Sequence, residues 1–140
     1  MRNPFIAMVL VLGSVSAFGS GFKCETINAV PATSVKLFNH INAEDGTRTP
    51  AAMVISNEDE GTILVAKGSA IRKHNRANTV QYVVDGNKRL GADSAILQIT
   101  FKEGREVLEA GEVVRGQLIL VDGSDRSVSE LDCERYLKNL

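Results

Sequence analysis

Two cysteines and two histidines are the side chains best suited to redox or metal chemistry in this chain, but their spacing argues against both. Cys24 and Cys133 are the only cysteines. A redox pair usually has the spacing Cys-x-x-Cys, and a structural zinc site takes four Cys or His ligands at short spacings. The cysteines lie far from each other and from the histidines, His40 and His74. The spacing therefore predicts one structural disulfide between Cys24 and Cys133, and neither a metal nor a cofactor is expected.

Neither histidine belongs to a recognisable catalytic motif. The chain has no Gly-x-Ser-x-Gly, no His-Glu-x-x-His and no phosphate-binding glycine loop. His40 falls on the outward row of an expected strand, and His74 falls in an expected loop. Both are interpreted as solvated surface residues. A small hydrolase with a spatially assembled site around one of them stays open as an alternative, because catalytic triads are spatial arrangements.

Carboxylates gather at residues 58–60 and again between 103 and 112. Two carboxylates that flank a groove can hydrolyse glycosides. Sugar sites also tend to use aromatic platforms, and this chain has no Trp and only two Tyr. Both groups are therefore expected to face water, and no catalytic residue is assigned.

The most uneven charge distribution is a run of cations without acids between residues 61 and 84, continued at 88–89. If these cations converge across a hairpin, they form a patch for phosphates or anionic envelope polymers. The alternative is a solvated strand edge on which cations discourage aggregation. Nucleic acid is not expected, because aromatic residues are not interleaved. The candidate patch consists of Lys67, Arg72, Lys73, Arg76, Lys88 and Arg89.

Residues 1–17 have the pattern of a bacterial secretory signal. Arg2 supplies the positive charge, residues 5–12 are apolar and residues 15–17 (VSA) offer a peptidase site, so cleavage is expected between 17 and 21. The apolar run is shorter than the roughly 20 residues of a membrane span. The expected location is the periplasm or the medium, with no membrane anchor after cleavage.

The remaining residues, 18–140, are predicted to form a single β domain. Removing the leader takes away one charged residue, Arg2, which leaves 15 Lys and Arg against 17 Asp and Glu, a net charge of −2. Such a balance is typical of neither a nucleic-acid-binding protein nor an acidic tail. The length of this segment is normal for one domain.

Period-2 alternation of apolar and polar residues indicates strands at 35–41, 80–85, 95–102 and 113–120. The apolar runs 51–56 and 63–66 are expected to be central strands covered on both faces, with a bulge at Gly68, and short strands are expected near 23–27 and 130–137. Asp85-Gly86 predicts a tight hairpin turn. Helical alternatives stay open at 105–111 and in the tail from 128.

Seven or eight short strands with spaced turns predict an all-β fold, an antiparallel β-sandwich or a small barrel, with the N- and C-terminal strands linked by the disulfide. The functional expectation is a non-enzymatic exported domain that binds a protein or an anionic envelope partner, with 42–50 and 73–79 as contact loops. The hydrolase and a structural subunit of a surface assembly are the alternatives. The sequence does not determine the oligomeric state.

Overall fold

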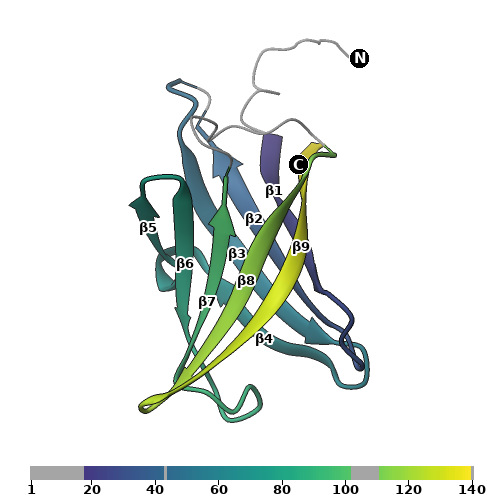
Figure 1. Cartoon of the computed structure of the whole chain (residues 1–140). Helices are drawn as coiled ribbons and strands as arrows, with labels where there is room; N and C mark the ends of the chain where they lie inside the picture. Colours follow the sequence, from purple (N-terminus) through teal and green to yellow (C-terminus); the bar gives the residue numbers. More distant parts are fainter. Residues whose placement is uncertain (1–17, 43, 102–110, 140) are drawn as a thin grey trace, which may run out of the picture.

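Alternating side chains along the chain produce one antiparallel sheet in the computed structural model, which describes residues 18–42, 44–101 and 111–139 (Figure 1). The all-β class predicted from the alternation is confirmed. No helix within these ranges has the length and apolar character needed to cross a bilayer. The strands are β1 (Phe18–Thr26), β2 (Thr33–Ile41), β3 (Arg48–Asn57), β4 (Gly61–Lys67), β5 (Arg72–Arg76), β6 (Thr79–Asp85), β7 (Ser94–Thr100), β8 (Val113–Asp122) and β9 (Asp125–Asn139), with a short 3-10 turn, η2 (Gly68–Ala70), between β4 and β5.

The nine strands form a single curled sheet in the order β4-β3-β2-β1-β9-β8-β7-β6-β5. This half-barrel corresponds to the small-barrel alternative rather than to two stacked sheets. The first and last strands of the chain are neighbours in its centre, and every neighbouring pair is antiparallel. The two strands at the edges of the sheet, β4 and β5, are consecutive in the sequence.

The strands β4 and β5 run in the same direction and are joined by a short bend, so together they resemble one bent strand. They are separated by eight antiparallel steps around the sheet, so they run in the same direction. Only η2 and Ile71 connect them, and β4 pairs with β3 whereas β5 pairs with β6. Because β4 forms its ladder with β3 and β5 forms its ladder with β6, no ladder joins the start of β3 to β5 in the described sheet.

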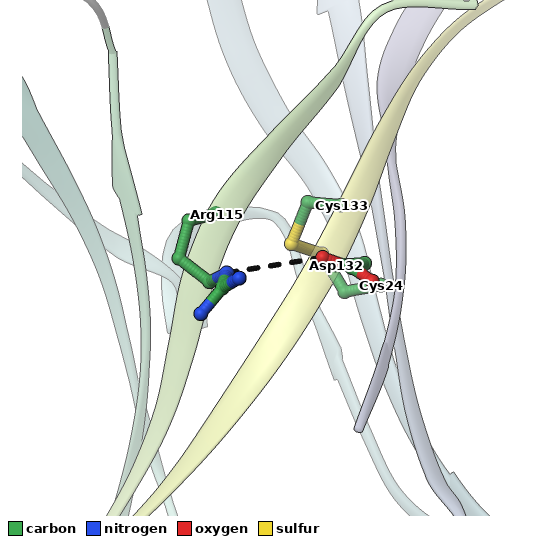
Figure 2. Close-up of a disulfide and its surroundings, with 4 residues drawn as sticks. All are labelled: Cys24, Arg115, Asp132 and Cys133. Atoms are coloured by element: carbon green, nitrogen blue, oxygen red, sulfur yellow. Dashed lines mark ion pairs between the residues drawn. A yellow bond between two sulfur atoms is a disulfide. The ribbon is translucent and has the colours of Figure 1, made fainter. Parts of the chain in front are cut away.

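One disulfide joins the two central strands. Cys24 of β1 and Cys133 of β9 are direct register partners with Cα atoms 4.0 Å apart, and both are buried (Figure 2). The predicted link between the chain's first and last strands is therefore confirmed, and the strands are paired rather than on facing sheets. On the opposite, solvent-facing side, Arg115 forms an ion pair with Asp132 at 3.8 Å.

A glycine makes room for the disulfide on the neighbouring strand. A Cβ on Gly116 of β8 would lie 2.7 Å from the Cys133 Sγ and 3.1 Å from the carbonyl oxygen of Gln98. The apolar row of the inner face continues from there across the sheet, where most side chains are almost fully buried. The largest members of this core are Phe22, Leu37, Met53, Ile55, Leu97, Ile99 and Leu131.

The outer face is held by polar pairs across strands. Gln81, Gln98 and Gln117 follow one another on β6, β7 and β8, and hydrogen bonds of 2.7 and 3.0 Å join them in series. The row ends where the amide of Gln117 donates to Glu130 of β9 at 2.8 Å. Such cross-strand pairs contribute about 0.2–1 kcal/mol each.

Two aromatic rings cover a glycine on the outer face of β1. Gly21 pairs with Phe38 on one side and with Tyr136 on the other, and these two rings meet edge to face at 5.8 Å between centroids. A Cβ on Gly21 would collide with the carbonyl oxygen of Leu37. The Tyr136 hydroxyl donates to that same carbonyl at 3.4 Å, and burial raises the pKa of Tyr136 to about 12.

Three local predictions were wrong. The run 63–66 is not a central strand, because β4 is an edge strand and Val65 is 51% exposed. The expected loop at 73–79 is largely β5. The expected hairpin at Asp85-Gly86 is instead a longer connection, residues 86–93, and Gly86 does not have a positive φ. The strand expected near 130–137 is confirmed as part of β9, the longest strand of the described residues, so the helical alternative for the tail does not hold. The helical alternative at 105–111 lies mostly outside the described residues.

We predict that the disulfide and Gly116 are energetically coupled. In the variant Cys24→Ala/Cys133→Ala, loss of a cross-link over 109 residues lowers the free energy of unfolding by about 4–5 kcal/mol by the chain-entropy argument. Gly116→Ala costs about 1–3 kcal/mol when the sulfur is present, and clearly less in the cysteine-free protein. Urea unfolding of the four proteins in this cycle measures the coupling. Equal costs of Gly116→Ala in both backgrounds would contradict it.

We predict an alkaline loss of stability caused by Tyr136. Its folded-state pKa of about 12 lies above the unfolded value of about 10, so its contribution is full below pH 10 and disappears as the pH rises through 12. The variant Tyr136→Phe has no ionisable phenol and should lose less stability over this interval. Thermal unfolding at several pH values compares the two proteins, and parallel curves would refute the assignment.

Candidate anion-binding site

A cavity of about 300 Å³ opens where β3 and β5 lack a shared ladder. Its described lining comes from six strands, from the turn before β3 and from Phe101, which follows β7. The start of β3 and the end of β5, which contribute lining residues, lie at the end of the sheet opposite the β8–β9 hairpin (Figure 1). The described residues that line the cavity are Phe22, Asn39, Gly46, Thr47, Arg48, Lys73, Asn75, Val80, Tyr82, Phe101 and Arg135.

Arg135 is the buried cation of this site. It follows Leu131 and Cys133 on the inward row of β9, and it is only 3% exposed. Its register partner on β1 is Phe22, and the guanidinium carbon lies 5.5 Å from the centre of that ring. The Nε atom is buried without a hydrogen-bond partner.

Polar atoms of two neighbouring strands are also left unpaired at the cavity. Asn39 of β2 is 4% exposed and its Oδ1 atom has no partner, and the buried Nε of Arg48 on β3 has none either. Arg48 lies across the strand pair from Ile41, just beyond the register shift at Phe38/Asn39. Leaving a buried polar group without a hydrogen bond costs about 1–3 kcal/mol of stability. A cluster of such groups at a cavity is therefore typical of a ligand-binding site.

All the charged side chains in the described lining of the cavity are positive. Arg48, Lys73 and Arg135 contribute three cations, and no acidic side chain of the described residues lines it. The ion pairs found in the described part of the chain belong to Arg72 and Arg115 instead. Burial lowers the pKa of Arg135, and the charge of Arg48 lowers it further. Tyr82 acts in the opposite direction, but no carboxylate of the described residues lines the cavity beside Arg135.

The rest of the lining is apolar and aromatic. Phe22 and Phe101 lie with ring centroids 6.3 Å apart, and Val80 and Tyr82 of β6 are both buried beside the cavity. A pocket that is apolar with a few converging polar groups is the usual form of a small-molecule site. The arrangement can hold an anionic group on its cations and an apolar body on its rings.

The predicted basic patch is not brought together as one surface. On β5, Lys73 lies in register with Tyr82 and lines the cavity, whereas Arg72 lies one residue earlier on the opposite face and pairs with Asp85 at 3.4 Å. Arg76 also alternates away from Lys73, and Lys67 is exposed at the end of β4. Lys88 and Arg89 lie in the 86–93 connection, where Arg89 donates to the carbonyl oxygen of Glu60 at 2.8 Å.

Both histidines are exposed and neither belongs to the described lining of this cavity. His40 lies on the outer face of β2 as expected. His74 lies on β5 rather than in a loop, opposite Gln81 of the outer row. No cluster of three or more potential metal ligands occurs within the described ranges.

Sequence reasoning missed Arg135, Asn39 and Arg48. For the first two a signal exists, because each is a polar residue on the inward row of an alternating strand, after Cys133 and after Leu37 respectively. Arg48 has no such signal, since its inward position depends on the register shift between β2 and β3. The predicted contact loop at 42–50 does contribute Gly46, Thr47 and Arg48 to the lining.

Comparisons of the chain with models of protein families, with curated proteins and with solved structures found no match. The geometry of the cavity is therefore the basis for any functional conclusion.

We predict that Arg135→Met raises or preserves the stability of the ligand-free protein. The substitution keeps an unbranched apolar stem over Phe22 and removes a buried charge, whereas most substitutions of a residue this buried cost stability. Urea unfolding in a chloride buffer measures the difference. Arg126→Met, an exposed arginine at the far β8–β9 hairpin, is the control. A loss of more than about 2 kcal/mol in Arg135→Met alone would show that the protein itself compensates the charge.

Proposed function

We propose that this protein is an exported, non-enzymatic domain that binds an anionic partner through the cavity at the open end of its sheet. The observation that carries the proposal is Arg135, a 97% buried arginine whose Nε has no partner and which faces a cavity with two more cations. Buried arginines normally have all their N–H groups paired, and we take the unpaired Nε–H of an arginine facing a cavity as support for a ligand that supplies the missing acceptor and charge.

The disulfide supports export. Disulfides persist in oxidising compartments and are rare in the cytosol, so the Cys24–Cys133 bond indicates a non-cytoplasmic location. The pattern of residues 1–17 narrows the proposal to the periplasm or the medium. The disulfide also lies next to the site, because the Phe22–Arg135 pair is the next inward pair along the same two strands.

Two alternatives have less support. The hydrolase was motivated by the histidines, and both are exposed on the outer face and neither lines the cavity described above. A structural subunit would join through the free edges of β4 and β5. The edge strand β5 carries charge on both of its faces, at Arg72 and Arg76 on one and at Lys73 on the other, and charged edge strands commonly discourage such pairing.

The proposal predicts that the two faces of β5 differ in their effect on anion binding. The probe is 1-anilinonaphthalene-8-sulfonate, and its matched neutral control is N-phenyl-1-naphthylamine, which lacks the sulfonate. We expect fluorescence titration to show saturable binding of the sulfonate that weakens with salt. Lys73→Met should raise its Kd about two- to five-fold, as expected for a partly exposed charge pair.

Arg76→Met is the matched variant on the opposite face of the same strand, and it should leave the Kd unchanged. Equal binding of the charged and neutral probes would contradict a site for anions. If Arg76→Met raised the Kd of the sulfonate more than Lys73→Met does, the binding site would have to lie on the outer face instead.

A further inference from the structure

The donors of the cavity are side chains rather than backbone groups. The turn that precedes β3 supplies Gly46 and Thr47 to the lining, but their backbone N–H groups are already used. Gly46 N–H donates to the carbonyl oxygen of Asn42 at 2.9 Å, and Thr47 N–H donates to Asp45 Oδ1 at 3.0 Å. Phosphate sites commonly use a nest of free backbone N–H groups around a tetrahedral anion. This turn offers no such nest.

The orientation of Arg135 favours a planar anion. Its guanidinium carbon lies 5.5 Å from the centroid of the Phe22 ring, and the N–H groups of a guanidinium all point outward in the plane of the group. The unpaired Nε–H is one of these N–H groups. A carboxylate matches an edge of a guanidinium with two parallel hydrogen bonds.

Two further groups are placed to complete the recognition. Asn39 has a buried, unpaired amide oxygen, and its side-chain amide can donate as well as accept. Arg48 brings a second guanidinium close enough to depress the pKa of Arg135. An anion between the two arginines would relieve their repulsion.

The size and the lining of the cavity indicate the rest of the ligand. A volume of about 300 Å³ is at the lower limit for small-molecule sites, so a single small molecule fits better than a segment of polymer. Phe22, Tyr82 and Phe101 provide aromatic surface beside the cations. The complementary ligand therefore has one charged end and an apolar or aromatic body.

We propose that the cavity binds a small organic carboxylic acid with an apolar body, with its carboxylate on Arg135 and Asn39 and its body against Phe22 and Tyr82. This rests on the proposed function and narrows its partner from anions in general to monocarboxylates. Arg135 is then the specificity-determining residue, and Lys73 at the rim attracts the anion without selecting its shape.

Isothermal titration calorimetry of the disulfide-bonded protein tests the proposal with four small probes that share a phenyl ring: phenylacetate, its neutral amide phenylacetamide, phenyl phosphate and benzenesulfonate. We expect phenylacetate to bind one to one and the amide to bind at least tenfold more weakly. Phenylacetate should bind more tightly than phenyl phosphate, and it should displace the anilinonaphthalene sulfonate probe.

Two variants separate charge from shape at Arg135. Arg135→Lys keeps the charge and loses the planar edge, so we expect it to weaken phenylacetate at least tenfold while the sulfonate probe changes by less than threefold. Arg135→Met should abolish phenylacetate binding, and Arg126→Met at the far hairpin should change nothing. If either variant at Arg135 fails to fold, two experiments on the unchanged protein still test the carboxylate site. These are the comparison of phenylacetate with phenylacetamide and the displacement of the sulfonate probe.

The outcomes that overturn the inference differ from those that overturn the proposed function. If phenyl phosphate binds more tightly than phenylacetate, or if Arg135→Lys binds phenylacetate normally, a site for planar carboxylates is wrong while a site for anions stands. If phenylacetate neither binds nor displaces a sulfonate probe that binds in a Lys73-dependent manner, the carboxylate proposal alone fails. If no anion binds, both fail.

Discussion

The pairing of β1 with β9, fixed by the bond between Cys24 and Cys133, sets the register on which the inner face depends. Side chains alternate between the faces of a strand, so a slip of one residue would exchange the inner and outer rows. The bond makes such a slip between these two strands impossible without breaking it. It thereby keeps Phe22 and Arg135 together on the inner face, two residues further along their strands. The same covalent link organises both the core and the candidate site.

The two ends of the curled sheet are used differently. Around the disulfide, apolar side chains fill the inner face, and the absence of a side chain at Gly116 leaves room for the sulfur of Cys133. Toward the ends of β2 and β9 the inward rows continue with Asn39 and Arg135, which the described residues leave unsatisfied. Local departures from the rules of a well-packed core are expected at functional sites, where they cost stability and are tolerated for binding.

Much of the fold followed from the sequence because its physical signals are local or covalent. Alternation located β2, β6, β7 and β8, and the positions of two isolated cysteines near the ends of the chain indicated the link between the terminal strands. The strand β5 was missed because its sequence, RKHNR, has no apolar row. Its strand conformation comes from pairing with β6 rather than from burial of its own side chains. The apolar run of β4 was misplaced because periodicity does not distinguish an edge strand from a covered one.

The candidate site was harder to predict, because it depends on which inward-facing side chains of different strands are brought to the same cavity. Basic residues close together in the sequence suggested one patch, but alternation along β5 separates Lys73 from its neighbours Arg72 and Arg76. The cations that do meet, Arg48 and Arg135, come from distant parts of the sequence. Their meeting requires the curl of the sheet, the register shift in β3 and the pairing of β1 with β9.

The bend between β4 and β5 makes this sheet suited to circular permutation. Every ladder except that of β1 with β9 joins consecutive strands, and no ladder joins β4 to β5 in the described sheet. A chain opened within Gly68–Ala70, with β9 connected to β1 by a short linker, would read β5 to β9 and then β1 to β4. All of its ladders would then be hairpins between sequence neighbours, and its free ends would lie on the two edges of the sheet. The lower contact order of such a chain favours faster folding to the same architecture.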